Sequence, residues 1–167
     1  TLAAASALVQ AQTKAPPANV HDAQVKGVYE QREKDWRIGA IVYQVLPDRF
    51  APAADLEAKR HLYPAPKILR RWDETPKRGT YVESAKLWSH EIEFWGGDLK
   101  SVASKLDHVQ RLGADVLYLN PTHLAYTNHK YDALDFQAVS PEYGTREDFR
   151  RLAADFSRAE EQHARVG

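Results

Sequence analysis

The sequence contains no cysteine and no methionine among its 167 residues. The absence of cysteine excludes disulfide bonds, thiolate-bound zinc and cysteine nucleophiles, and it is compatible with any compartment. Because translation begins with methionine, we expect the natural reading frame to start upstream of Thr1. An excess of charge is also missing, since Lys plus Arg equals Asp plus Glu at 23 each. No nucleic-acid partner is therefore expected, because binding to phosphates needs a positive field.

The sequence also lacks a long hydrophobic run. No apolar segment approaches the roughly 20 residues of a membrane-spanning helix, so no membrane partner is expected. Residues 1–26 are rich in alanine and proline, and Val9-Gln10-Ala11 places small residues where a signal peptidase reads them. We interpret 1–26 as a signal-peptide remnant and linker, which predicts a periplasmic or secreted protein. A disordered alanine-rich leader is the alternative interpretation.

Several common catalytic motifs are absent as well. Gly96-Gly97 is too sparse for a dinucleotide fingerprint, and no glycine-rich phosphate loop ends in Lys-Ser or Lys-Thr. The seven histidines include no His-Glu-x-x-His pair, which is the spacing that places two zinc ligands on one helical face. No Gly-x-Ser-x-Gly elbow is present either. These absences argue against nucleotide-dependent enzymes, zinc proteases of this type and serine hydrolases.

What the sequence does contain is an alternation of apolar runs and amphipathic segments. Residues 38–46 and 114–119 are short and nearly continuous in apolar side chains, which is typical of strands buried on both faces. Apolar residues recur at three- and four-residue spacing over 99–112 and again over 149–156, where Thr145 begins a variant of the capping box. The order strand, helix, strand, helix predicts a parallel sheet, either doubly wound or closed into a barrel.

The connection between the first strand and the first helix is the expected place for function. At residues 47–97 it is far longer than the roughly 12 to 15 residues usual for a loop, so we expect short elements within it. It follows the carboxyl end of a strand, where parallel α/β folds build their binding sites. Aromatic residues gather here and after the second strand, and they suit the flat faces of sugar rings. From chemistry alone, a small loop core of their own is the more common explanation.

Five short motifs follow one another along the chain: VYQVLPDRF at 42–50, FWGGDL at 94–99, LYLNP at 117–121, NHKYD at 128–132, and YGT with DF over 143–149. In this order they resemble motifs of the alpha-amylase family of glycoside hydrolases, and most closely those of its neopullulanase and cyclomaltodextrinase branch. The resemblance implies an α/β fold that is a partial TIM (β/α)8 barrel. Residues 27–167 would form its N-terminal part, with two βα units and a long loop after strand 1, truncated before strand 3.

The resemblance also implies an activity. The family cleaves α-glucosidic bonds with retention of configuration, using three acidic residues on later strands of the barrel. We therefore expect an exported glycoside hydrolase acting on starch-derived glucans, with an α-glucan oligosaccharide or polysaccharide as its partner. No catalytic residue is assigned within this chain, which we expect to be inactive alone. A glucanotransferase of the same family or a non-catalytic sugar-binding remnant are the alternatives.

Two residues are candidates for substrate binding by similarity. Tyr131 would stack under the sugar ring at the cleaved position, and His129 would form hydrogen bonds with the sugar hydroxyls. The carboxylates of Asp132 and Asp135 are expected to orient the loop rather than to touch sugar, because loop carboxylates usually bind nearby backbone groups.

No cofactor and no metal are expected. Relatives in this branch often hold calcium in the loop after Pro-Asp-Arg-Phe, where several Asn and Asp oxygens meet the Gly-Gly-Asp turn. Here residues 51–55 read Ala-Pro-Ala-Ala-Asp, so most of those oxygen donors are missing. We expect Asp98, in the Gly-Gly-Asp turn, to cap the helix that follows it.

Overall fold

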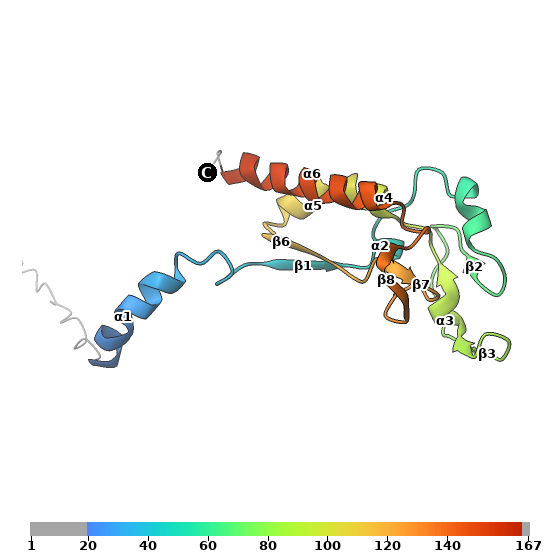
Figure 1. The fold of residues 1–167 in the computed structure, drawn as a ribbon, viewed down its shortest axis with the longest axis horizontal. Helices are drawn as coiled ribbons and strands as arrows, with labels where there is room; N and C mark the ends of the chain where they lie inside the picture. The colour runs from blue at the N-terminus through green and yellow to red at the C-terminus, as the bar shows by residue number, and fades with distance from the viewer. Residues whose placement is uncertain (1–19, 165–167) are drawn as a thin grey trace, which may run out of the picture. The chain divides into compact units, whose positions relative to one another are not determined.

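The computed structural model describes residues 20–164 of the chain, which divides into two compact units between Gly39 and Ala40. The described part of the first unit contains helix α1, Val20–Arg32 (Figure 1). The proposed signal-peptide remnant lies outside the described residues, whereas α1 begins within the segment whose composition indicated a linker. An i, i+4 ion pair between Lys26 and Glu30, with N and O 3.7 Å apart, supports this largely exposed helix.

The second unit is built on a parallel strand pair. Strand β1, Val42–Val45, pairs with β6, Val116–Leu119, and the register sets Val42 opposite Val116. Both strands lie within the predicted runs, and their parallel pairing follows the predicted alternation (Figure 1). The expectation of burial on both faces was wrong, because Val42 is 57% exposed and Tyr118 is 48% exposed. Each sheet among the described residues has two strands, so the strand faces and outer edges have few neighbours.

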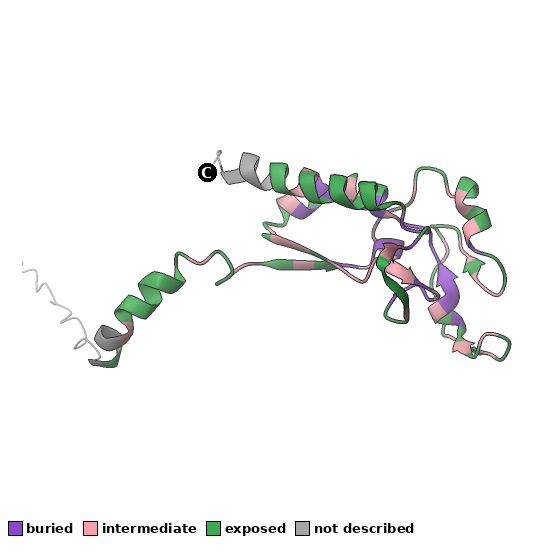
Figure 2. Ribbon diagram, viewed as in Figure 1, coloured by how far each residue is buried: buried purple, intermediate pink, exposed green. Residues whose placement is uncertain are grey.

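The long connection contains several short elements, as predicted from its length. They are α2 (Pro47–Phe50), the 3₁₀ helix η1 (Glu57–Leu62), β2 (Ile68–Leu69), β3 (Tyr81–Val82), β4 (Leu87–Trp88), α3 (Ser89–Ile92) and β5 (Glu93–Phe94). Strand β2 pairs parallel with β5, and β3 pairs antiparallel with β4. Buried residues gather at α2 and β5, where the two ends of the connection meet (Figure 2).

The helix predicted over 99–112 forms as two helices, α4 (Leu99–Ala103) and α5 (Leu106–Arg111). The prediction of one continuous helix was therefore wrong at residues 104–105. Ser104 Oγ donates a hydrogen bond to the carbonyl of Ser101 at 2.7 Å, and the amide of Lys105 donates to the carbonyl of Val102 at 3.0 Å. Such i to i−3 bonds tighten the backbone and interrupt the α-helical ladder.

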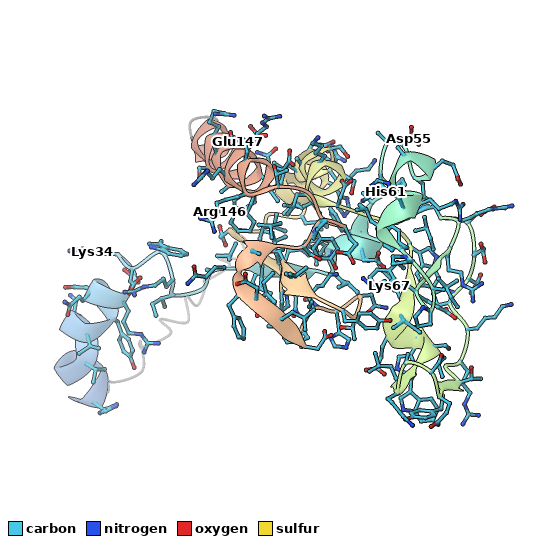
Figure 3. All side chains as sticks on the ribbon, turned by 45° about the vertical axis from the view of Figure 1, so that its right-hand side comes forward. Lys34, Asp55, His61, Lys67, Arg146 and Glu147 are labelled. Carbon is cyan, nitrogen blue, oxygen red and sulfur yellow. The ribbon has the colours of Figure 1, made fainter. Side chains whose placement is uncertain are left out.

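A hairpin follows β6 that the sequence pattern did not indicate. Strands β7 (His123–Ala125) and β8 (Ala133–Val139) pair antiparallel, with two register irregularities, and enclose the loop 126–132. On β8, Asp135 Oδ1 accepts a hydrogen bond from the amide of Gln137 at 2.7 Å, in agreement with the expected backbone role of this carboxylate. The guanidinium of Arg146 donates to the carbonyl of Gln137 at 2.5 Å, and Figure 3 shows this side chain beside the hairpin.

The second predicted helix is α6, Arg146–Ala164, which begins where its capping signal lies. The amide of Asp148 donates to Thr145 Oγ1 at 3.1 Å, and the amide of Thr145 donates to Asp148 Oδ2 at 2.9 Å. This reciprocal pair is the capping box expected from the sequence. None of the helices between residues 20 and 164 combines the length and apolarity needed to cross a membrane.

The apolar core of the second unit lies where α4, α5 and α6 meet. Its buried members are Leu99, Val102, Leu106, Tyr143 and Leu152, with Leu117 and Leu119 of β6 packed against them. The helices thus cover β6 from one side, and the connection 47–97 and the β7–β8 hairpin extend from the carboxyl ends of the two parallel strands.

Candidate functional site

The loop 126–132, between β7 and β8, is held by one carboxylate. Asp132 Oδ2 accepts hydrogen bonds from the amides of Tyr126 and Thr127, both at 3.1 Å, and Asp132 Oδ1 accepts one from the hydroxyl of Thr127. Partial burial alone would raise the pKa of the Asp132 carboxyl, but these hydrogen bonds outweigh it and lower the pKa. Asp132 therefore orients the loop, as expected from the sequence.

Asn128 attaches this loop to the end of the long connection. Its side-chain nitrogen donates to the carbonyls of His90, at 2.6 Å, and Glu93, at 2.8 Å. Its own carbonyl accepts a hydrogen bond from the hydroxyl of Tyr143 at 2.7 Å. Because all of these groups are buried or partly buried, the loop has little freedom to move away from α3 and β5.

Lys130 lies in the middle of the loop and is completely buried, with its backbone in the left-handed region at φ 62°. Its Nζ lies 3.3 Å from Glu142 Oε2, and Glu142 Oε1 lies 2.6 Å from Lys67 Nζ, a residue labelled in Figure 3. Burial lowers the pKa of Lys130, an effect that the attraction of Glu142 opposes. Burial alone would raise the pKa of Glu142, but the two lysines and Ser140 together lower it.

The two candidate sugar-binding residues flank this buried lysine. The rings of His129 and Tyr131 have centroids 5.8 Å apart and an interplanar angle of 34°, and Tyr131 is 61% exposed. The amide of Tyr131 donates to His129 Nδ1 at 3.1 Å, so the ring proton of a neutral His129 lies on Nε2. That Nε2 lies 3.7 Å from Glu91 Oε1, on α3. The structure thus brings together an exposed ring face, an imidazole donor and a carboxylate.

Asp48 is another buried acidic residue, and it lies in the motif at 42–50 without a role predicted from the sequence. It is completely buried, and its carboxylate accepts hydrogen bonds from the amides of Trp95, at 3.0 Å, and Gly96, at 2.9 Å. Burial raises its pKa against these bonds and against the charge of Arg49. The guanidinium of Arg49 lies 4.1 Å from the ring centroid of Trp95, so α2 is held firmly to the turn after β5.

At the Gly-Gly-Asp turn, the oxygens of Gly96 and Asp98 bind groups of the protein itself. Asp98 Oδ1 accepts a hydrogen bond from the amide of Ser101 at 2.8 Å, which confirms Asp98 as the cap of α4. Lys59 Nζ lies 2.8 Å from the carbonyl oxygen of Gly96 and 3.0 Å from Asp98 Oδ2. The ammonium of Lys59 thus binds the two oxygens of this turn that could otherwise contact a metal ion. Between residues 20 and 164, no three His, Cys, Asp or Glu side chains converge as metal ligands would.

Three residues of the site, Lys130, Glu142 and Glu91, were not predicted from the sequence. Lys130 and Asp48 both lie inside motifs that carry the family resemblance, which was the available signal for them. A charged loop residue is usually solvated, however, and its burial shows only when its partners are placed around it.

A groove of about 620 Å³ lies between β6 and α6 and is lined by residues that include Leu117 and Phe156. Neither His129 nor Tyr131 lines this groove, so it is separate from the candidate sugar site.

Comparison with known proteins places the chain in a family. Residues 44–162 match the family model for the alpha amylase catalytic domain. An amylopullulanase of Thermoanaerobacterium saccharolyticum is 37% identical over 132 residues, which are 72% of this chain and 10% of the relative. Neopullulanase 2 of Thermoactinomyces vulgaris is 31% identical over 129 residues, which are 74% of this chain and 18% of the relative.

A solved structure is similar to the chain as well. The ligand-free cyclic alpha-maltosyl-(1→6)-maltose hydrolase of Arthrobacter globiformis is 36% identical, with a TM-score of 0.58, over 75% of this chain and 24% of that protein. This chain thus spans about a quarter or less of the length of these relatives. The similarity implies part of a TIM barrel, although the described sheets are small. The chain belongs to the alpha-amylase family of glycoside hydrolases.

Proposed function

We propose that this chain forms part of the catalytic domain of an exported glycoside hydrolase that cleaves α-glucosidic bonds in starch-derived glucans. In this proposal, β1 with α4 and α5, and β6 with α6, are the first two βα units of a (β/α)8 barrel. The family membership and the names of the relatives, which include amylopullulanase and neopullulanase, support it. The observation that supports a sugar site is the exposed Tyr131 ring, which lies beside His129 on a fixed loop.

The loop suits a sugar ring in both shape and polarity. Tyr131 presents a flat apolar face on which the C–H face of a glucose unit can stack. His129 Nε2–H is available to donate a hydrogen bond to a sugar hydroxyl, and Glu91 Oε1, 3.7 Å from that nitrogen, can accept one from a neighbouring hydroxyl. Because the hydrogen bonds of Asp132 and the ion pair of Lys130 fix the loop, the two rings would bind a sugar with little loss of conformational freedom.

The chemical step in this proposal belongs to acidic residues on later strands. A retaining glycosidase needs a carboxylate nucleophile and a general acid and base, and a third acidic residue steadies the distorted ring. We assign none of these roles to a residue of this chain, and we expect it to release no reducing sugar from starch, maltodextrin or cyclodextrin. In the whole protein, transfer to another sugar shares the same covalent intermediate, so product analysis with a sugar acceptor separates hydrolase from glucanotransferase.

Sugar binding by Tyr131 is tested with the chain itself. Titration with maltose, followed by NMR shifts of the loop amides, gives a dissociation constant for the unsubstituted chain. Tyr131→Ala is expected to weaken binding about tenfold or more, whereas Tyr131→Phe, which keeps the ring, changes it little. Leu134→Ala is the control, because Leu134 is 69% exposed on the neighbouring strand β8. Equal affinities of the Tyr131→Ala variant and the unsubstituted chain for maltose would show that Tyr131 does not bind the sugar.

Export is a separate part of the proposal. Expression of the natural gene with its upstream sequence, followed by cell fractionation, is expected to place the protein in the periplasm or the medium. N-terminal sequencing of the recovered protein would then show cleavage after Ala11 or close to it. Recovery of uncleaved protein in the cytoplasm would contradict the signal-peptide interpretation.

A further inference from the structure

A second group of aromatic side chains lies on the β3–β4 hairpin, apart from Tyr131. Tyr81 and Trp88 face each other across the two strands, with ring centroids 5.8 Å apart at an interplanar angle of 75°. The imidazole of His90 stacks on Trp88 at 6.4 Å and 28°. Tyr81 and Trp88 are each 49% exposed, and His90 is exposed as well. We call Tyr81, Trp88 and His90 the hairpin platform.

Hydrogen bonds hold the backbone that carries the hairpin platform. Thr80 and Ser89 are joined twice, by the Ser89 amide to the Thr80 carbonyl at 2.8 Å and by the Thr80 amide to Ser89 Oγ at 3.1 Å. The amide of Trp88 donates to Glu91 Oε2 at 2.7 Å. A side chain at Gly79 would place its Cβ 2.0 Å from His90 Nδ1, so the glycine leaves room for the imidazole ring. The rings are therefore positioned by their surroundings, and about half of the surface of Tyr81 and of Trp88 stays exposed.

The hairpin platform is connected to the candidate site through α3. Helix α3 carries both His90 and Glu91, and the Glu91 carboxylate lies 3.7 Å from His129 Nε2. The side chain of Asn128, in the loop of the candidate site, donates to the carbonyl of His90 at 2.6 Å. Helix α3 thus joins the hairpin platform to the loop of the candidate site.

We propose that Tyr81, Trp88 and His90 form a second surface that binds an α-glucan. This surface would contact a different glucose unit of the same glucan from the unit that stacks on Tyr131. This inference rests on the proposed function. Aromatic rings beside a polar rim suit a sugar face, and the ion pair of Lys86 with Glu83 lies at the tip of the same hairpin. A protein partner fits less well, because a stable interface buries about 800 Å² on each side and this hairpin has only two-residue strands.

The length of the sugar distinguishes binding at the hairpin platform from binding at Tyr131. Calorimetry or NMR titration with maltose and with maltoheptaose measures the two affinities. Trp88→Ala is expected to weaken maltoheptaose binding about three- to tenfold and to leave maltose binding unchanged. Trp88→Tyr keeps a flat ring and is expected to bind within about twofold of the unsubstituted chain. Trp36→Ala is the control, since Trp36 is 71% exposed in the other unit.

The same experiment distinguishes failure of this inference from failure of the proposed function. If Tyr131→Ala weakens both sugars and Trp88→Ala weakens neither, the hairpin platform is overturned and the site at Tyr131 stands. If only Trp88→Ala has an effect, the hairpin platform stands and the role of Tyr131 is overturned. An equal loss of both sugars in Trp88→Ala, or no binding of either sugar by the unsubstituted chain, also overturns the inference. Amide spectra outside the hairpin verify that each variant keeps its fold.

Discussion

The ammonium of Lys130 lies 3.3 Å from the carboxylate of Glu142, and no more than 3% of either residue is exposed. Lys130 lies between His129 and Tyr131 in the sequence, and its Nζ also donates a hydrogen bond to the carbonyl of Ala125, where the loop begins. Burying two charges costs a large desolvation free energy, so each depends on the other. The pair therefore acts as a support for the loop, and its loss is expected to affect both stability and sugar binding.

Glu142→Gln is expected to lower the free energy of unfolding by about 3 kcal/mol, because it leaves the buried ammonium of Lys130 without its counter-charge. Urea unfolding followed by circular dichroism measures the change. The double substitution Lys130→Met with Glu142→Gln removes both charges and is expected to cost less than the sum of the two single substitutions. Simple additivity would show that the two groups do not stabilise each other.

Acid is expected to weaken the fold through the same carboxylate. The pKa of Glu142 in the folded chain lies below the ordinary value of 4.5, so its contribution to stability is present above that pH and is lost as pH falls through the folded pKa. Unfolding free energies measured across this acidic range test the expectation. The Glu142→Gln variant should show a shallower dependence, whereas Glu147→Gln, at an exposed position of α6, should match the unsubstituted chain.

The ammonium of Lys59 is expected to occupy the position that a metal ion would take at the Gly-Gly-Asp turn. Because its ammonium binds the Gly96 carbonyl and Asp98, added calcium should not raise the melting temperature. Lys59→Met removes two charge-assisted hydrogen bonds and is expected to lower stability by about 1 to 3 kcal/mol. Lys100→Met is the matched control, since the Lys100 side chain is 73% exposed. A rise in melting temperature with calcium that Asp98→Ala abolishes would contradict the expectation that this turn binds no calcium.

Gly97→Ala is expected to destabilise the second unit by about 1 to 3 kcal/mol through overpacking. A Cβ at this position would lie 2.2 Å from the carbonyl oxygen of Pro47, on a backbone that Asp48 holds in place. Thermal melting measures the loss. Gly27→Ala is the contrast, because no atom lies within 4 Å of the added Cβ and alanine favours the helix α1. Equal melting temperatures for the Gly97 variant and the unsubstituted chain would show that the turn can shift.

The family motifs and the short-range signals could be recognised from the sequence. Asp98 caps α4 through Ser101, and Thr145 pairs with Asp148, because a cap acts over three residues and its partners are visible in the pattern. Strands β1 and β6 lie within runs whose apolar content already marked them as strands. The motif with His129 and Tyr131 was assigned by resemblance, and its sugar-binding role stays a prediction.

Tertiary structure decided what depends on partners far apart in the chain. Lys67 and Glu142 are 75 positions apart, so neither residue type nor spacing indicates that they meet in a buried site. The sequence likewise does not indicate that Glu91 lies beside His129 or that Asp48 accepts a hydrogen bond from the amide of Trp95. A charge remains in water unless the fold provides a counter-charge and hydrogen bonds, and those come from other elements. The sequence by itself thus determined the family and the local caps, whereas the packing of distant segments decided which polar groups support the site.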